Sequence, residues 1–200
     1  MKRRRGKLWI GLGILLIVAA IGLSAYNLYE SRRAKESVER NLQELETEML
    51  ETSTEEEQPE YMRNPEMEMP VKRIHGIDYI GVLELPTLGL KLPVISGWSY
   101  PYLRIAPCRY QGSAYADNLI LAAHNYASHF GGLKTLHQGD EVRFTDVDEH
   151  TFIYEVAGIE NLQPTAVEEM EDGGWDLTLF TCTIGGRSRV TVRCERIIEP

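Results

Sequence analysis

The chain has 200 residues, three cysteines and a formal net charge of −9. Three cysteines are too few, and odd in number, for a disulfide-built scaffold, and the acidic balance argues against a nucleic-acid-binding protein. The charges are unevenly distributed, because a basic head is followed by an apolar stretch, a glutamate-rich stretch and a globular remainder of single-domain size.

The N-terminal segment is predicted to be a membrane anchor. Residues 1–7 carry five basic side chains, and residues 8–29 carry no charged one. At 1.5 Å per residue, this apolar stretch forms about 33 Å of helix, which crosses a hydrocarbon core of roughly 30 Å. Because positive charges stay in the cytoplasm, we predict a single-pass membrane protein whose N-terminus is cytoplasmic and whose remaining chain is extracellular.

Two alternatives to this anchor remain, a cleaved signal peptide and a buried helix of a soluble protein. The apolar stretch is longer than a typical signal peptide's, and residues 23–25 (LSA) match its cleavage site poorly. An uncleaved anchor is the preferred interpretation.

Residues 30–70 are predicted to be an acidic spacer, helical at first and disordered later. Val38, Leu42, Leu45 and Met49 follow helical spacing, which predicts a short amphipathic continuation of the membrane helix. The glutamate-rich stretch 51–70 is expected to be extended or disordered and to act as a passive stalk.

The remaining residues, 71–200, show the pattern of short strands. Alternation predicts strands at 79–85, 88–95, 141–145, 151–159, 177–181 and 189–197, and an apolar run predicts another at 118–123. Pro93 indicates an edge position or a bulge in its strand. Short helical turns are expected at 130–136 and 165–170. The predicted fold class is therefore all-β, with a mainly antiparallel closed barrel preferred over a sandwich.

Cys182 is the best candidate for a nucleophile. It follows a predicted strand and precedes a glycine-containing loop, so its thiol can be exposed while its backbone is held. Cys194 lies inside a predicted strand, and Cys108 follows Pro107 in an irregular stretch. A lone cysteine is more often an inert buried thiol, which is the competing interpretation of Cys182.

A cysteine nucleophile needs a basic or cationic neighbour, because a free thiol has a pKa of about 8.5. His124 ends the apolar strand and is the preferred partner, with a structural, hydrogen-bonded histidine as the alternative. The other four histidines are expected to be solvated surface residues: His75, His129, His137 and His150.

Attack on a carbonyl also requires a group that stabilises the developing oxyanion. Arg187 and Arg189 follow the glycine loop, and a strand–loop–strand hairpin can return either one to Cys182. Arginines at strand starts are usually plain surface charges, which is the competing interpretation of both. The choice between the two arginines rests on strand register.

Three segments together resemble the sortases. Residues 177–182 (LTLFTC) are similar to the TLxTC signature, and residues 121–125 (LAAHN) resemble the strand that ends in the family's catalytic histidine. Ala123 stands where the family most often has glycine. Arg189 and the following Val-Thr-Val resemble the last strand, which opens with the catalytic arginine. The likeness covers about residues 77–198, nearly all of the globular part.

The resemblance implies a sortase-type closed eight-stranded β-barrel and a cysteine transpeptidase of Gram-positive cell surfaces. Cys182 would be the nucleophile, His124 the general acid and base, and Arg189 the group that holds the substrate carbonyl and its oxyanion. Thr181 would help to bind substrate. The expected donor is a secreted protein with a C-terminal sorting signal, and the expected acceptor is an amine of a cell-wall precursor or a pilin-like protein. No metal or organic cofactor is required.

Further expectations depend on the same resemblance. The short segment between residues 159 and 177 is more similar to classes A or D than to class B, and the lack of a second apolar span argues against the pilus-polymerising class. The acidic residues Glu168, Glu169, Glu171 and Asp172 could bind calcium or form a solvated loop. Cys108 and Cys194 could form a disulfide if their strands adjoin. A cysteine peptidase that uses water, and a silent binding module, are the alternative functions.

Overall fold

The computed structural model describes residues 2–50, 59–171, 174–183 and 185–197. The chain divides into two compact units, Met1–Arg33 and Ala34–Pro200. A single long helix, α1 (Lys2–Leu50), runs from the first unit into the second.

Helix α1 contains the predicted anchor and the predicted amphipathic continuation. Among the described residues it is the one helix long and apolar enough to cross a membrane, from Leu12 onward. Its apolar side chains between Leu12 and Tyr29 are mostly exposed, as a lipid-facing surface would be. The helical prediction for 38–49 is confirmed.

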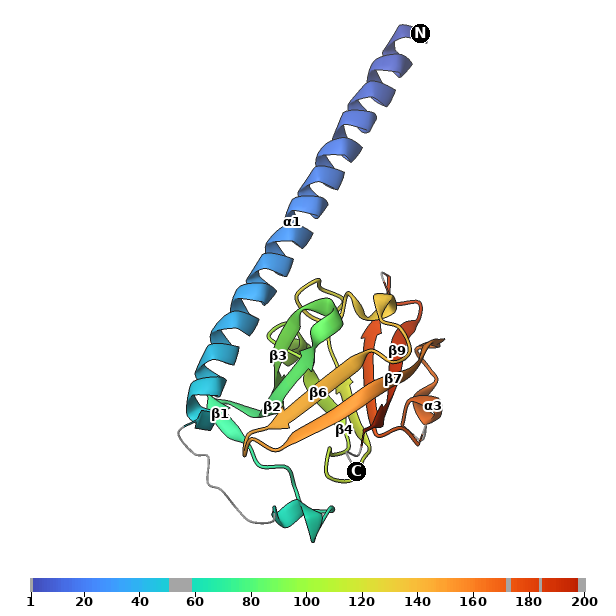
Figure 1. Cartoon of the computed structure of the whole chain (residues 1–200). Helices are drawn as coiled ribbons and strands as arrows, with labels where there is room; N and C mark the ends of the chain where they lie inside the picture. Colours follow the sequence, from blue (N-terminus) through green and yellow to red (C-terminus); the bar gives the residue numbers. More distant parts are fainter. Residues whose placement is uncertain (1, 51–58, 172–173, 184, 198–200) are drawn as a thin grey trace. The chain divides into compact units, whose positions relative to one another are not determined.

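The second unit is built around a closed barrel of eight strands (Figure 1). The order around the barrel is β2 (Ile77–Leu85), β3 (Leu90–Ile95), β4 (Cys108–Gln111), β5 (Leu119–Ala122), β8 (Leu177–Cys182), β9 (Arg189–Arg196), β7 (Thr151–Leu162) and β6 (Glu141–Asp146). Pairing of β6 with β2 closes the ring, and a short strand β1 (Lys72–Ile74) extends it as a hairpin on β2. The predicted mainly antiparallel barrel is confirmed, with parallel pairs only at β3–β4 and β5–β8 among the described strands.

All seven predicted strands are present, but β1 and β4 were not predicted. Cys108 was expected in an irregular stretch and is instead the first residue of β4. The two predicted helical turns are present as η3 (Leu133–Thr135) and α3 (Val167–Glu171). Two further turns, η2 (Pro86–Leu88) and α2 (Tyr100–Leu103), follow β2 and β3.

Closure of the barrel depends on Gly81. It has a φ of 154° and pairs with Asp146 of β6, next to a register shift between Tyr79 and Gly81. A Cβ atom at this position would overlap the backbone of Thr145. Only glycine therefore allows β2 to approach β6 this closely.

The barrel interior holds the main hydrophobic core. Residues of β2, β3, β5, β6, β7, β8 and β9 contribute to it, and fully buried examples are Leu83, Leu121, Phe144, Phe152, Tyr154, Leu179 and Val192. A second cluster lies outside the barrel, where Leu45 and Met49 of α1 pack on residues of β1, β2, β3 and β4. The amphipathic face predicted for 38–49 is thus buried against the barrel.

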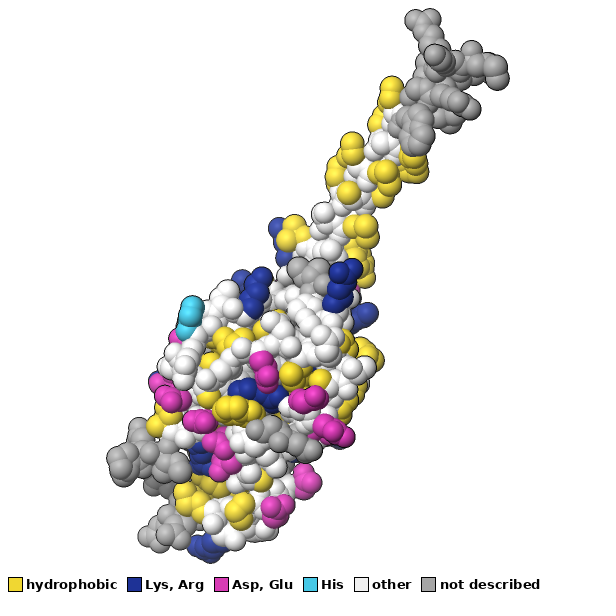
Figure 2. All heavy atoms as spheres, turned by 90° about the vertical axis from the view of Figure 1, so that its right-hand side faces the viewer, with side chains coloured by type: hydrophobic (Ala, Val, Ile, Leu, Met, Phe, Trp, Pro, Cys, Tyr) yellow, Lys and Arg dark blue, Asp and Glu magenta, His cyan; other side chains and the backbone are white. Residues whose placement is uncertain are grey.

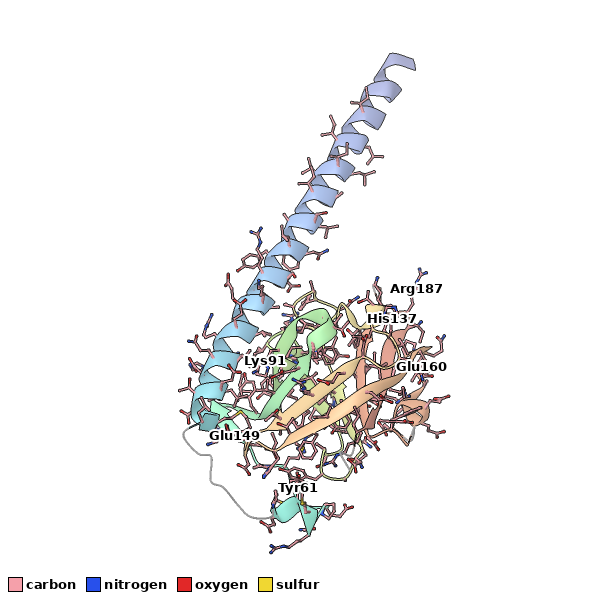
Figure 3. All side chains as sticks on the ribbon, viewed as in Figure 1. Tyr61, Lys91, His137, Glu149, Glu160 and Arg187 are labelled. Carbon is pink, nitrogen blue, oxygen red and sulfur yellow. The ribbon has the colours of Figure 1, made fainter. Side chains whose placement is uncertain are left out.

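The segment that precedes β1 is not a passive stalk. Residues 51–58 lie outside the described residues, but η1 (Glu60–Met62) and the chain after it contact the barrel. The ring of Tyr61, which is labelled in Figure 3, stacks on that of Tyr115 with 4.6 Å between centroids, and Met69 is buried in the core. The expectation of an extended or disordered stretch is wrong for this part of 51–70.

Candidate active site

Strand order brings the three predicted catalytic residues to one end of the barrel. In the antiparallel pair β8–β9, Cys182 lies opposite Arg189. In the parallel pair β5–β8, Ala122 aligns with Phe180, so His124 and Cys182 follow at equivalent positions two residues later. Residues opposite each other on paired strands share a face of the sheet, with Cβ atoms about 5 Å apart. His124, Cys182 and Arg189 therefore lie side by side on the same face.

Thr181 ties the end of β5 to β8. Its buried hydroxyl donates to the carbonyl oxygen of Ala123 at 2.8 Å, and the Ala123 amide donates to the Phe180 carbonyl at 3.2 Å. These two bonds extend the pairing past the last residue of β5. The backbone of His124 is thereby held beside that of Cys182.

The register distinguishes the two candidate arginines. Arg189 begins β9, is half-buried, and places its Cζ atom 5.4 Å from the centroid of the Phe180 ring. Arg187 is exposed on the loop between β8 and β9 and points away from the barrel (Figure 3). Because Cys182 is exposed and pairs with Arg189, the geometry favours Arg189 as its partner.

The loop between Cys182 and Arg189 is closed by its own hydrogen bonds. The Thr183 amide donates to the Ser188 carbonyl at 2.8 Å, and the Ser188 amide donates to the Thr183 hydroxyl at 3.0 Å. Gly185 and Gly186 both have positive φ, which the turn requires. The hairpin therefore presents Cys182 and Arg189 from a fixed backbone.

The loop after His124 folds back onto that residue. The Phe130 amide donates to the His124 carbonyl at 3.2 Å, and the His129 amide donates to the Tyr126 carbonyl at 3.0 Å. The Tyr126 ring lies 5.1 Å from the His124 ring and 5.4 Å from the His129 ring. These tilted ring contacts restrain the orientation of the His124 imidazole.

His129 was predicted to be a solvated surface residue, and this is wrong. The residue is fully buried, and neither ring nitrogen has a hydrogen-bond partner within the described residues. Burial, assisted by nearby His124, lowers the pKa of His129 from 6.5 to about 4. His150 is also not freely solvated, because its Nδ1 lies 3.0 Å from the buried carboxylate of Asp146, whereas His75 and His137 are exposed as expected.

The buried His129 makes stability depend on pH. Its folded-state pKa is depressed, so its contribution is fully present above pH 6.5 and is lost as the pH falls towards 4, up to about 3 kcal/mol. Urea unfolding of the full-length chain in detergent between pH 7 and 4.5 should show a steeper loss for the native protein than for His129→Leu. Parallel pH dependences for the two proteins would contradict a neutral buried imidazole.

The face that carries the three residues continues into an apolar floor. Phe180 packs with Ala122, Ile120 and Met170, and the partly buried Tyr110 and Leu162 lie against this cluster. The cluster is on the outside of the barrel, beneath the β7–β8 connection that contains α3. Its four central members are buried, so the cluster packs the β7–β8 connection against the barrel beside the three residues.

Arg193, which the sequence did not single out, holds the β7–β8 connection in place. The side chain is buried, and its Nε donates to Glu160 at 2.7 Å. Its other nitrogens donate to the Thr178 hydroxyl at 3.0 Å and to the carbonyls of Met170 and Glu169. Period-two alternation from Arg189 puts Arg193 on the same outer face, which is the signal that could have identified it. Acidic side chains are spread over the side of the molecule that Figure 2 shows.

Replacing Arg193 should destabilise the domain. Arg193→Ala leaves several buried oxygens unpaired, and we expect the free energy of unfolding to fall by about 2–4 kcal/mol. Arg143, whose exposed side chain pairs with Glu141, provides the control, and Arg143→Ala should cost less than about 1 kcal/mol. Denaturant titration measures both, and equal losses would contradict the role of Arg193.

A cavity of about 630 Å³ opens on the other side of β8. Thr181, Thr183 and Val190 contribute to its lining, together with Asn125 and Lys134. Thr181 thus lies next to open space as well as to Ala123. The cavity adjoins the reactive end of the barrel.

The other two cysteines are buried free thiols. Burial raises the pKa of both Cys108 and Cys194 to about 12, so neither ionises near neutrality. Strands β5 and β8 separate β4 from β9, so the strands of the two cysteines do not adjoin and the condition for a disulfide is not met. Cys182 is the exposed cysteine of the three.

The acidic connection 168–172 has partners within the protein. The Tyr110 hydroxyl donates to the Glu171 carboxylate at 3.0 Å, and Asp172 lies outside the described residues. Across the described residues, no group of three or more His, Cys, Asp or Glu side chains could hold a metal ion.

Comparisons with known proteins agree with the fold. The sortase-domain family model matches residues 83–197. A search among curated proteins gave no match. Sortase C1 of Streptococcus agalactiae is 27% identical, with 64% of this chain and 72% of that chain covered at a TM-score of 0.54. Sortase C1 of Streptococcus suis is also 27% identical, with 78% and 96% covered at a TM-score of 0.54.

A Clostridium perfringens sortase D5 shares the fold. It is 21% identical, and the match covers 82% of this chain and 98% of that chain at a TM-score of 0.57. The structural matches thus include both C and D sortases, and the predicted likeness to classes A or D is not confirmed. The family is nevertheless clear, because its model matches more than half of the chain and the predicted barrel is present. This chain belongs to the sortase family of cysteine transpeptidases.

Proposed function

We propose that this protein is a membrane-anchored transpeptidase that acts outside the cell. Residues 1–7 would form a cytoplasmic basic head, 8–29 the membrane span, 30–70 the spacer and 71–200 the catalytic domain. The apolar part of α1 and the preceding basic residues support this orientation. The donor substrates would be secreted proteins with a C-terminal sorting signal.

Cys182 would attack the carbonyl carbon of one peptide bond in the donor. The thiolate forms the new C–S bond, and the carbonyl oxygen becomes an oxyanion that the Arg189 guanidinium stabilises. Collapse of this intermediate breaks the C–N bond, and the His124 imidazolium gives its proton to the departing amine. The products are a thioester on Cys182 and the free C-terminal fragment of the donor.

The second half-reaction reverses these roles. An amine of a cell-wall precursor or a pilin-like protein attacks the thioester, and neutral His124 accepts the proton that the amine loses. A new amide bond forms, and the thiolate of Cys182 leaves. Thr181 supports both steps through its bond to Ala123, which keeps His124 beside the thiol, and as a wall of the substrate site.

One observation carries this proposal, the register that aligns Cys182 with both Arg189 and the end of β5. A nucleophile, a proton carrier and an oxyanion-stabilising cation are the groups that acyl transfer needs on one face. Their arrangement requires no cofactor.

Product analysis distinguishes the transferase from a peptidase that uses water. The full-length chain in detergent is incubated with a peptide library, with and without a high concentration of a primary amine. We expect amide products that contain the amine, at the expense of hydrolysed peptide. If only hydrolysed peptides form at every amine concentration, the protein is a cysteine peptidase.

A further inference from the structure

The cavity of about 630 Å³ at the reactive end of the barrel is lined by the chain neighbours of both reacting residues. Thr181 and Thr183 stand on either side of Cys182, Asn125 follows His124, and all three contribute to the lining. The volume lies in the range of small-ligand sites, about 300–1,000 Å³. A molecule in this space, which we call the mouth cavity, is therefore next to the backbone of both the nucleophile and the proton carrier.

The loop after His124 forms most of the wall, and it is held in one compact conformation. The Gly131 amide donates to the Tyr126 carbonyl at 2.9 Å, and the Leu133 amide donates to the Phe130 carbonyl at 3.1 Å. A Cβ atom at Gly131 would overlap the Tyr126 carbonyl oxygen, so glycine allows this close approach. The mouth cavity is thus formed before a ligand arrives, and binding costs little entropy of the loop.

Strand order indicates which reactant meets the mouth cavity. β8 lies between β5 and β9, so His124 is on one side of Cys182 and Arg189 is on the other. The departing amine takes a proton from His124 and the incoming amine returns one to it, so both occupy the β5 side of the thioester. The loop that lines the cavity continues from the end of β5. The acceptor therefore approaches from the side of the mouth cavity.

The acceptor must extend its amine across the end of β8. Thr181 and Val190 are paired, buried and turned towards the barrel interior, whereas the Cys182 side chain alternates to the outside. A primary amine on a slender, unbranched chain can cross this rim while its carrier stays in the cavity. As the new C–N bond forms, the C–S bond breaks, the thiolate leaves, and His124 takes the proton from nitrogen.

The charge of the lining indicates what else the acceptor carries. Lys134 is the one charged residue among the described residues of the lining, and its exposed ammonium has no ion-pair partner within the part of the chain that the structure describes. The polar side chains beside it, Asn125 and Thr183, are neutral. A lysine ammonium without a counter-ion attracts an anionic group such as a carboxylate.

We propose that the mouth cavity binds the acceptor and that Lys134 selects a primary amine whose carrier also bears a carboxylate. This inference rests on the proposed function and names the chemistry of its second substrate. A peptide or amino acid with a side-chain amine and a free carboxylate has both groups, whereas a neutral carrier has the amine alone.

Transfer kinetics with two acceptors tests the proposal. Nα-acetyl-lysine and Nα-acetyl-lysine amide share the same side-chain amine and differ in the carboxylate. The donor is a library peptide that forms the acyl-enzyme and ends in an amide one residue after the scissile bond, so that it brings no carboxylate into the cavity. For the full-length chain in detergent, we expect the KM of the carboxylate acceptor to be about fivefold lower than that of the amide, and Lys134→Met should abolish the difference.

Charge reversal and a distant lysine provide the controls. Lys134→Glu should invert the preference and favour the amide acceptor. Lys35→Met removes an exposed lysine of α1 outside the cavity, and the KM of both acceptors should stay native. Single-turnover acylation is measured on every variant, because it precedes acceptor binding and reports on the donor alone.

A second variant tests the cavity itself. Ala127 lines it and is exposed, so Ala127→Trp fills the space without disturbing the core. The KM of both acceptors should rise, and a larger share of the thioester should be hydrolysed. The rate of acylation should change little.

Three results would overturn the inference. They are an equal KM for both acceptors in the native protein, an equal rise for both in Lys134→Met, and a loss of acylation in Ala127→Trp and Lys134→Met, which would assign the cavity to the donor. If the native protein forms amide products without distinguishing the acceptors, only the acceptor site fails. If hydrolysed peptides alone form with either amine, the proposed transfer reaction fails as well.

Discussion

Cys182→Ala should abolish acyl-enzyme formation and reduce turnover by on the order of 10⁴-fold or more, because no other group can form the thioester. The side chain is exposed at the end of β8, so its loss removes few packing contacts. We therefore expect the unfolding midpoint to stay close to that of the native chain. Turnover and thermal unfolding are measured on the same preparation.

Cys194→Ala provides the matched control for Cys182→Ala. Cys194 is fully buried in the core and its pKa is raised to about 12, so its thiol takes no part in the reaction. This variant should lose stability through the missing sulfur atom but should keep its activity when it is folded. Undiminished turnover by Cys182→Ala would refute the mechanism.

Arg189→Ala has the second largest expected effect. If the guanidinium stabilises the oxyanion, its removal should lower kcat by roughly 10²–10³-fold, equivalent to about 3 kcal/mol of transition-state stabilisation. The donor KM should change less than kcat, because the oxyanion exists only after attack. Single-turnover acylation is the appropriate measurement, since it isolates the first chemical step.

Arg187→Ala is the control for this prediction. Arg187 carries the same charge two residues away but is exposed on the loop, whereas Arg189 pairs with Cys182. A general loss of positive charge would affect both variants similarly. Loss of acylation in Arg187→Ala with normal acylation in Arg189→Ala would reassign the oxyanion-stabilising role to Arg187.

The sequence predicted much of the barrel because its longer strands alternate clearly. β6 and β9 show inward apolar residues separated by polar ones, and β7 and β8 keep most of this pattern, with the apolar Ile153 and Phe180 at outward positions. β4 was missed because it is only four residues long and directly follows a proline, and the three-residue β1 is too short for any period. Such strands exist because neighbouring strands supply their hydrogen bonds, which a local pattern cannot show.

Part of the candidate site could be predicted from the sequence, because its residues lie next to strands that the sequence pattern indicates. Cys182, His124 and Arg189 each stand at the end or start of a predicted strand, where side chains reach the rim of a barrel. The contact between Thr181 and Ala123 joins residues 58 positions apart, and burial of His129 depends on how its loop folds back. Neither follows from local periodicity, because both depend on tertiary packing.

Residues 51–70 of the spacer are where the structure departs most from the prediction made from sequence composition. Its composition, rich in glutamate, predicts a chain that avoids burial, but Tyr61 and Met69 pack on the barrel. A few apolar side chains are enough to order a polar segment when a core surface is adjacent. Average composition over 51–70 concealed these two residues.

Mapping the acyl adduct tests the central claim most directly. The full-length chain is quenched in acid after a brief incubation with the peptide library, digested, and sequenced by tandem mass spectrometry. The account predicts an acyl mass on the fragment that contains Cys182 and none on the fragments that contain Cys108 or Cys194. Cleavage of library peptides without any adduct on Cys182 would contradict it.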